Sequence, residues 1–82
     1  MSVPQQGKQR LPEALEPHIE VVGNHKIVVE GCKGVTLYQQ NVIELTLVRQ
    51  RLRILGDELS MEQLITGDAM ITGKLFSVEW VE

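Results

Sequence analysis

The side chains that could do chemistry are few, and the two histidines come first among them. His18 and His25 have Glu16 and Glu20 nearby, and imidazole with carboxylate is a common metal-binding combination. Their spacing matches no familiar ligand pattern, and His25 falls in an expected turn. We therefore expect both histidines at the surface, with no metal bound.

Cys32 is the only cysteine, beside a glycine-rich turn and next to Lys33. A reactive thiolate needs a base or a positive environment, and no histidine or asparagine is placed for a catalytic arrangement. A lone cysteine also allows no intrachain disulfide, which fits a reducing, cytoplasmic compartment. We expect an ordinary turn cysteine.

Two adjacent carboxylates, Asp57 and Glu58, follow Gly56. A catalytic pair must face each other across a cleft, whereas neighbours at a turn point to solvent. The serines lie in no G-x-S-x-G elbow, and the glycines form no phosphate loop. The sequence therefore predicts neither an enzyme nor a cofactor.

Arg49, Arg51 and Arg53 form the one basic cluster and would share a face if they lie on a strand. They could bind an anionic ligand, either nucleic acid or a lipid head group. The alternative is a solvated outer face that protects a strand edge from aggregation. A net charge of −3 and the lack of interleaved aromatic residues argue against nucleic acid.

The chain divides into a tail over residues 1–17 and one all-β domain over residues 18–82. The tail holds all 3 prolines and has no sustained apolar pattern, so we expect a flexible arm, or one that orders on a partner. Its polar start predicts no signal peptide, and no apolar run is long enough for a transmembrane segment.

From residue 18 onward β-branched residues alternate with polar ones, and glycines separate the runs. A three-residue loop at residues 23–25 brings Ile19, Val21, Ile27 and Val29 to one face. Two-residue turns beginning at Gly56 and Gly73 fit a repeated strand–glycine–strand motif.

These two turns assign the flanking residues to faces, because side chains alternate along a strand. The turn at Gly56 pairs Ile54 with Leu59 and puts Leu52 and Met61 on the same inner face. The turn at Gly73 puts inward a set of residues from both sides of it: Ala69, Ile71, Phe76, Val78 and Trp80. Leu55 and Leu75 are left on the outer face, where they could line an interface.

The predicted fold is an antiparallel meander of glycine-turned hairpins that forms a small roll or sandwich. The alternative is a short β-solenoid, in which each glycine marks a corner and successive repeats stack in parallel. A thin core, with only three aromatic side chains (Tyr38, Phe76 and Trp80), favours self-association or docking on a partner.

Several segments resemble the YqfC/YabP family of Firmicute sporulation proteins, and two of them look closer to the YqfC branch. The matching runs are Ile19–Asn24, Val29–Val35, Ile43–Thr46, Leu52–Leu59 and Ile71–Leu75. Two features depart from the family pattern, namely Arg49-Gln50 in place of a glycine and Cys32. The resemblance carries over no catalytic residue.

The resemblance implies a mother-cell protein made during spore formation that acts near the spore membrane, cortex or coat. Its expected partners are other sporulation proteins, including a membrane-protein neighbour at the forespore membrane, and the thin core adds a further copy of the chain itself. The leading hypothesis is a non-enzymatic assembly protein whose interface holds Leu55, Leu75 and Arg53. The alternative is an anionic-ligand module that uses Arg49, Arg51 and Arg53.

Overall fold

The computed structural model of the protein describes residues 17–64 and 67–81. Except for Pro17, the predicted tail lies outside these residues. The described chain forms six strands: β1 (His18–Val22), β2 (Lys26–Glu30), β3 (Gly34–Tyr38), β4 (Val42–Thr46), β5 (Arg51–Gln63) and β6 (Ala69–Val81). The predicted all-β class is confirmed.

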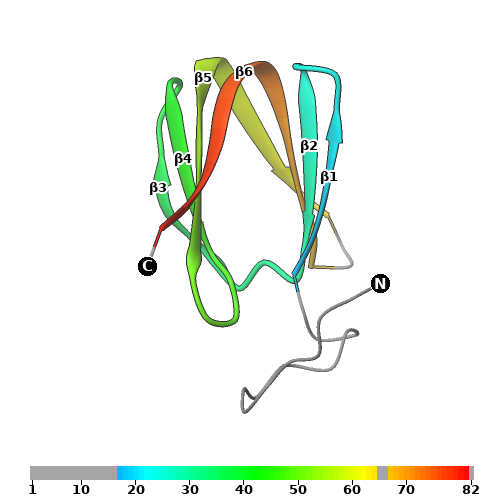
Figure 1. Ribbon diagram of the computed structural model, residues 1–82, viewed down its shortest axis with the longest axis vertical. Helices are drawn as coiled ribbons and strands as arrows, with labels where there is room; N and C mark the ends of the chain where they lie inside the picture. Colours follow the sequence, from blue (N-terminus) through cyan, green and yellow to red (C-terminus); the bar gives the residue numbers. More distant parts are fainter. Residues whose placement is uncertain (1–16, 65–66, 82) are drawn as a thin grey trace, which may run out of the picture.

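All six strands belong to one sheet, in the order β1-β2-β6-β5-β4-β3. The two longest strands, β5 and β6, bend midway and fold the sheet into a small roll with two facing layers (Figure 1). Every pairing is antiparallel. The antiparallel roll is therefore confirmed, and the solenoid with parallel stacking is not what forms.

The hairpin predicted around residues 23–25 is confirmed. Gly23 adopts a φ of 54°, and the His25 N–H donates to the Val22 carbonyl at 3.3 Å. Ile19 pairs with Val29 and Val21 with Ile27, as the predicted loop length requires. Glycine fits this turn because it tolerates positive φ without steric cost.

The hairpin turns predicted at Gly56 and Gly73 are wrong, because both glycines lie inside continuous strands. Ile54 pairs with Val78 instead of Leu59, and Gly56 is matched with Leu75. A Cβ at Gly56 would lie only 2.2 Å from the Lys74 carbonyl oxygen, and Gly73 has a φ of 135°. The glycines are there because the two bent strands approach each other too closely for a side chain.

The bend also reassigns Leu75. An extra residue, Phe76, interrupts the pairing between Leu55–Ser77 and Gly56–Leu75. This bulge turns Leu75 into the buried core, so its predicted outward orientation is wrong. Phe76 is left exposed instead of buried.

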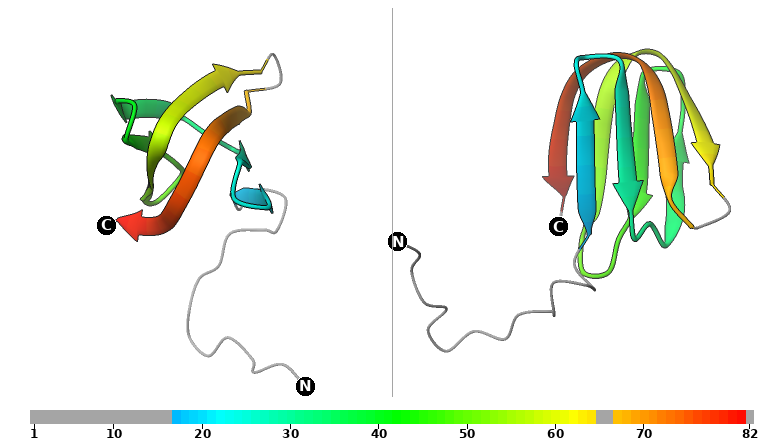
Figure 2. Two further views of the ribbon diagram at one scale, coloured as in Figure 1. Left: turned by 90° about the horizontal axis from the view of Figure 1, so that it is seen from above. Right: turned by 90° about the vertical axis from the view of Figure 1, so that its right-hand side faces the viewer.

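Each layer contains one hairpin and half of each long strand. The β1 layer consists of β1, β2, residues 69–73 of β6 and residues 59–63 of β5. The β3 layer consists of β3, β4, residues 51–55 of β5 and residues 75–81 of β6. The two layers are thus built on the same plan, related by an approximate two-fold axis through the bend (Figure 2).

Hydrogen bonds at the bend repeat this symmetry. The turn after β1 accepts from β6, with His25 O to Gly73 N at 3.2 Å and Asn24 O to Leu75 N at 2.7 Å. The turn after β3 accepts from β5 in the same way: Asn41 O to Gly56 N at 3.1 Å and Gln40 O to Leu59 N at 2.7 Å. Each hairpin therefore supports the corner of the long strand next to it.

The core is made of rows of side chains that cross each layer on its inner face. One row of the β3 layer runs Tyr38–Ile43–Ile54–Val78, and its counterpart in the β1 layer runs Val21–Ile27–Ile71–Met61. The next rows run Val35–Leu45–Leu52–Trp80 and Ile19–Val29–Ala69–Gln63. The central members of all four rows are almost fully buried, whereas the ends lie at the rims of the roll.

Candidate interaction edge

The roll has two rims where the edges of the layers face each other. At the first, which we call the Tyr38 rim, β3 lies opposite residues 59–63 of β5. At the second, the Trp80 rim, β1 lies on the same side of the roll as residues 75–81 of β6 (Figure 2). The approximate two-fold axis makes these rims equivalent, so their differences come from their side chains.

The Tyr38 rim is closed by hydrogen bonds between the layers. The Met61 N–H donates to the Tyr38 hydroxyl at 2.9 Å, so a side chain of one layer satisfies the backbone edge of the other. The Gln40 carbonyl accepts from the Leu59 N–H on the same edge. Edges that are covered in this way are poor templates for another strand.

The Trp80 rim has a counterpart of the second bond, from the Leu75 N–H to the Asn24 carbonyl at 2.7 Å, but none of the first among the residues that the structure describes. Val21 occupies the place equivalent to Tyr38 and has no polar atom on its side chain to reach across. Beyond the Leu75 N–H, the described part of β6 pairs with β5 alone and leaves its other edge unpaired. Such an edge presents N–H and C=O groups to any strand that can align with it.

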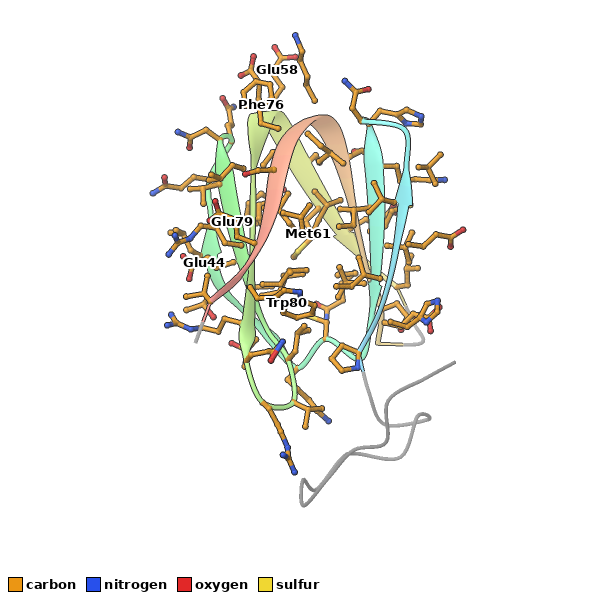
Figure 3. The ribbon with its side chains drawn as sticks, in the orientation of Figure 1. Glu44, Glu58, Met61, Phe76, Glu79 and Trp80 are labelled. Atoms are coloured by element: carbon orange, nitrogen blue, oxygen red, sulfur yellow. The ribbon has the colours of Figure 1, made fainter. Side chains whose placement is uncertain are left out.

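Apolar side chains gather along this unpaired edge. Phe76 is 64% exposed, Val78 39%, Trp80 51%, and Val21 on β1 53%. Val78 and Trp80 belong to the inner face, since they pair with the fully buried Ile54 and Leu52. Figure 3 shows Trp80 in the region between the two layers, below Met61, and Phe76 near the bend. The inward placement predicted for Trp80 is correct, but an edge position leaves the indole half uncovered.

Arg51 and Arg53 lie on the outer face of the β3 layer, where acidic side chains bind them. Glu44 is buried to 7% exposure, and its carboxylate accepts from Arg53 Nε at 2.8 Å. Arg51 Nη1 lies 3.5 Å from the same carboxylate, and Arg53 Nη1 lies 3.8 Å from Glu79. Two of the three arginines of the predicted cluster therefore share one strand face, and the described contacts of Arg51 and Arg53 already include carboxylates.

The remaining predicted interface residues are placed separately. Arg49 is exposed in the connection between β4 and β5, and Leu55 is half-buried on the outer face, opposite Val42 and Ser77. Leu75 is in the core. Interface roles for Leu55 and the arginines stay predictions, and the exposed apolar edge lies elsewhere, on residues 75–81.

The other chemical candidates stay apart. His18 and His25 are exposed, and Asp57 and Glu58 project from the bend. The Cys32 thiol is half-buried and donates to the Gly34 carbonyl at 3.4 Å. Within residues 17–64 and 67–81, no three histidine, cysteine or acidic side chains come together as a metal site would require.

Reasoning from sequence missed that residues 75–81 form an exposed edge. A signal was present in the repeat, since Leu59-Ser60-Met61 aligns with Phe76-Ser77-Val78, and two positions later Gln63 aligns with Trp80. One repeat unit therefore ends in the polar Gln63 and the other in Trp80, which indicates that the two edges differ. Only the correct pairing of the long strands shows that both positions lie at a rim.

The model of the YabP family matches residues 13–82, which include every strand of the roll. The chain belongs to the YabP family, and this membership fits a sporulation-related protein. Searches of the curated proteins and of the solved structures found no significant match. The described ranges hold no helix long and apolar enough to cross a membrane.

Proposed function

We propose that this protein is a non-enzymatic assembly protein of spore formation that binds protein partners by strand addition at residues 75–81. The observation that carries the proposal is the combination, on one strand, of an unpaired backbone edge with half-exposed Val78 and Trp80. Family membership supports the setting, which we place on the mother-cell side of the developing spore.

Strand addition suits this edge for two physical reasons. The free N–H and C=O groups supply main-chain hydrogen bonds whatever the partner's sequence, and the alternating apolar side chains add selectivity. Burying the exposed part of an indole on a partner also contributes hydrophobic free energy, at about 25 cal/mol per Å² of apolar surface. The edge therefore offers both parts of a recognition site.

The expected partners are other sporulation proteins at the spore membrane, cortex or coat, including a membrane-protein neighbour. They would supply an extended segment with an apolar residue opposite Val78 or Trp80. The anionic-ligand alternative is weaker on the observed contacts, because Glu44 and Glu79 lie against Arg51 and Arg53, two of the three arginines that it needs.

The test is site-specific photocrosslinking of the full chain in sporulating cells. A photoreactive phenylalanine analogue at Trp80 should give discrete adducts of defined mass, each identified by mass spectrometry. The matched control places the same analogue at Val48, which is similarly exposed at 41% but lies in the connection between β4 and β5. Identical adduct patterns at the two positions would contradict a role for this edge.

A further inference from the structure

We infer that the partner of residues 75–81 is, in the first place, the same segment of a second copy of this chain. The two segments would pair antiparallel about a two-fold axis at Val78 and join two β3 layers into one continuous sheet. This inference rests on the proposed function, since it names one occupant of the proposed edge.

The edges of the sheet are not equally available. Residues 59–63 are capped by Gln40 and Tyr38, and the pairing of β3 is interrupted by a register shift between Val35 and Leu37. A bulge of this kind discourages further pairing. Only β1 and residues 77–81, which follow the bulge at Phe76, remain as regular unpaired edges among the described strands.

Beyond the bulge at Phe76, residues 77–81 also lack the usual protection of an edge. Natural edges are guarded by lysine, proline, bulges or inward-pointing charges. This segment contains one charge, Glu79, which points outward beside Arg53, and its inner-face residues Val78 and Trp80 are apolar. In a native protein, an unprotected edge strand of this kind indicates that another strand covers it in the functional state.

The sequence of the segment is self-complementary in one register. A two-fold axis at Val78 places Val78 opposite Val78, Ser77 opposite Glu79, and Phe76 opposite Trp80 of the other copy. The most exposed apolar side chains then meet each other, and the Ser77 hydroxyl faces a carboxylate. Aromatic and aliphatic cross-strand pairs of this kind stabilise antiparallel sheets.

Neighbouring registers and the other edge fit less well. An axis at Glu79 would place two carboxylates directly opposite each other, and an axis at Ser77 would leave Trp80 without a partner residue from this segment. For β1, an axis at the middle of the strand places Glu20 opposite Glu20. Like charges in directly opposed positions destabilise a pair of strands.

Disulfide trapping tests this register in the full chain. With Cys32→Ser as background, a single cysteine at Val78 should form an intermolecular disulfide under diamide, because opposed residues lie about 4.5–5.5 Å apart between Cα atoms. A single cysteine at Ser77 is the matched control. In this register the two Ser77 Cα atoms lie roughly 8 Å apart, too far for a disulfide. Efficient trapping at Ser77 instead of Val78, or at neither, would overturn the inference.

Sedimentation equilibrium on the full chain supplies an independent readout. The mass should rise with concentration from the 9.2 kDa monomer to twice that value. Val78→Lys places two ammonium groups at the axis and should raise the dimer dissociation constant at least about tenfold. Val48→Lys, at a valine of similar exposure in the connection between β4 and β5, should leave it unchanged.

The far-ultraviolet circular dichroism of both lysine variants should match the parent, which separates loss of assembly from loss of fold. A parent chain that stays monomeric at all concentrations overturns the inference. The proposed function is then judged separately. Crosslinks from position 80 to other spore proteins would still support it, whereas their absence as well would remove both.

Discussion

Tyr38 and Val21 hold equivalent places at the two rims of the roll, but only Tyr38 reaches the opposite layer. Its hydroxyl accepts from the Met61 N–H at 2.9 Å, whereas Val21 is half-exposed at the matching position. The same fold thus carries one rim that a side chain closes and one where the described residues of β6 leave a strand edge unpaired. The lesson is that an internal repeat can conserve the corner of a fold while its edges diverge.

The largest effect should come from the corners, where the two halves are alike. Gly56→Ala forces a Cβ to 2.2 Å from the Lys74 carbonyl oxygen, and Gly73→Ala places one 2.7 Å from the Glu58 carbonyl oxygen. Each should destabilise the fold by about 3 kcal/mol or more, which is severe for a small domain. Urea denaturation measures this. Gly34→Ala is the control, since a Cβ there meets nothing within 4 Å.

If one corner glycine tolerates alanine and the other does not, the two halves are not equivalent in the way described. If both tolerate it, residues 51–63 and 69–81 do not approach each other at the bend as the structure places them. A normal midpoint for Gly34→Ala is needed for either conclusion.

The next effect compares the outer faces. The row Glu44–Arg53–Glu79 of the β3 layer corresponds to Val28–Met70–Glu62 of the β1 layer. Arg53→Met removes a cation that offsets the desolvation of the buried Glu44 carboxylate. It should lower the free energy of unfolding by about 2 kcal/mol. The double variant Glu44→Val/Arg53→Met, which copies the other layer, should recover to within about 1 kcal/mol of the parent.

A double-variant cycle from chemical denaturation checks this prediction. Recovery in the double variant means that the ion pairs mainly compensate a buried carboxylate. If the two single losses simply add, Glu44 and Arg53 act independently, and the comparison between the outer faces loses its meaning.

Only part of this comparison could be predicted from the sequence. Alternating β-branched residues identified the strands, and the loop of residues 23–25 gave the correct register for β1 and β2, because a short hairpin turn is a local feature. Gly56 and Gly73 could not be assigned in the same way. A turn and a corner both require glycine and both place Ile54 and Leu59 inward, so local alternation does not distinguish them.

What distinguishes a turn from a corner is the pairing of residues far apart in the chain. Ile54 lies beside Val78 only because β5 and β6 pair antiparallel along their length, and no glycine rule specifies that pairing. The same long-range pairing produces the bulge at Phe76 and buries Leu75. The candidate edge depends on it as well, which is why alternation alone places Trp80 in the core.

A smaller effect should come from removing the hydroxyl that closes the first rim. Tyr38→Phe deletes the acceptor of the Met61 N–H and should lower the free energy of unfolding by about 1 kcal/mol. Hydrogen exchange at Met61 should accelerate, while exchange at the buried Ile54 should change only with global stability. An unchanged rate at Met61 would show that the hydroxyl does not protect this edge.

The smallest effect on stability is expected at the second rim. Trp80→Gln installs the residue that occupies the equivalent place at Gln63, and the indole is already half-exposed, so the monomer should lose at most about 1 kcal/mol. The dissociation constant of the dimer should rise at least about tenfold, because the proposed aromatic contact with Phe76 of the second copy is lost. A large loss of monomer stability would instead make Trp80 a core residue.

The central claim is that residues 75–81 are covered by a second copy, and Trp80 reports on it directly because it is the only tryptophan in the chain. The decisive measurement is its fluorescence emission and acrylamide quenching over a range of concentrations of the full chain. The account predicts that emission shifts to shorter wavelength and quenching falls as the mass doubles. If the mass stays that of the monomer and the emission spectrum does not change with concentration, the account is contradicted. This holds whether the spectrum is that of an exposed or of a shielded indole.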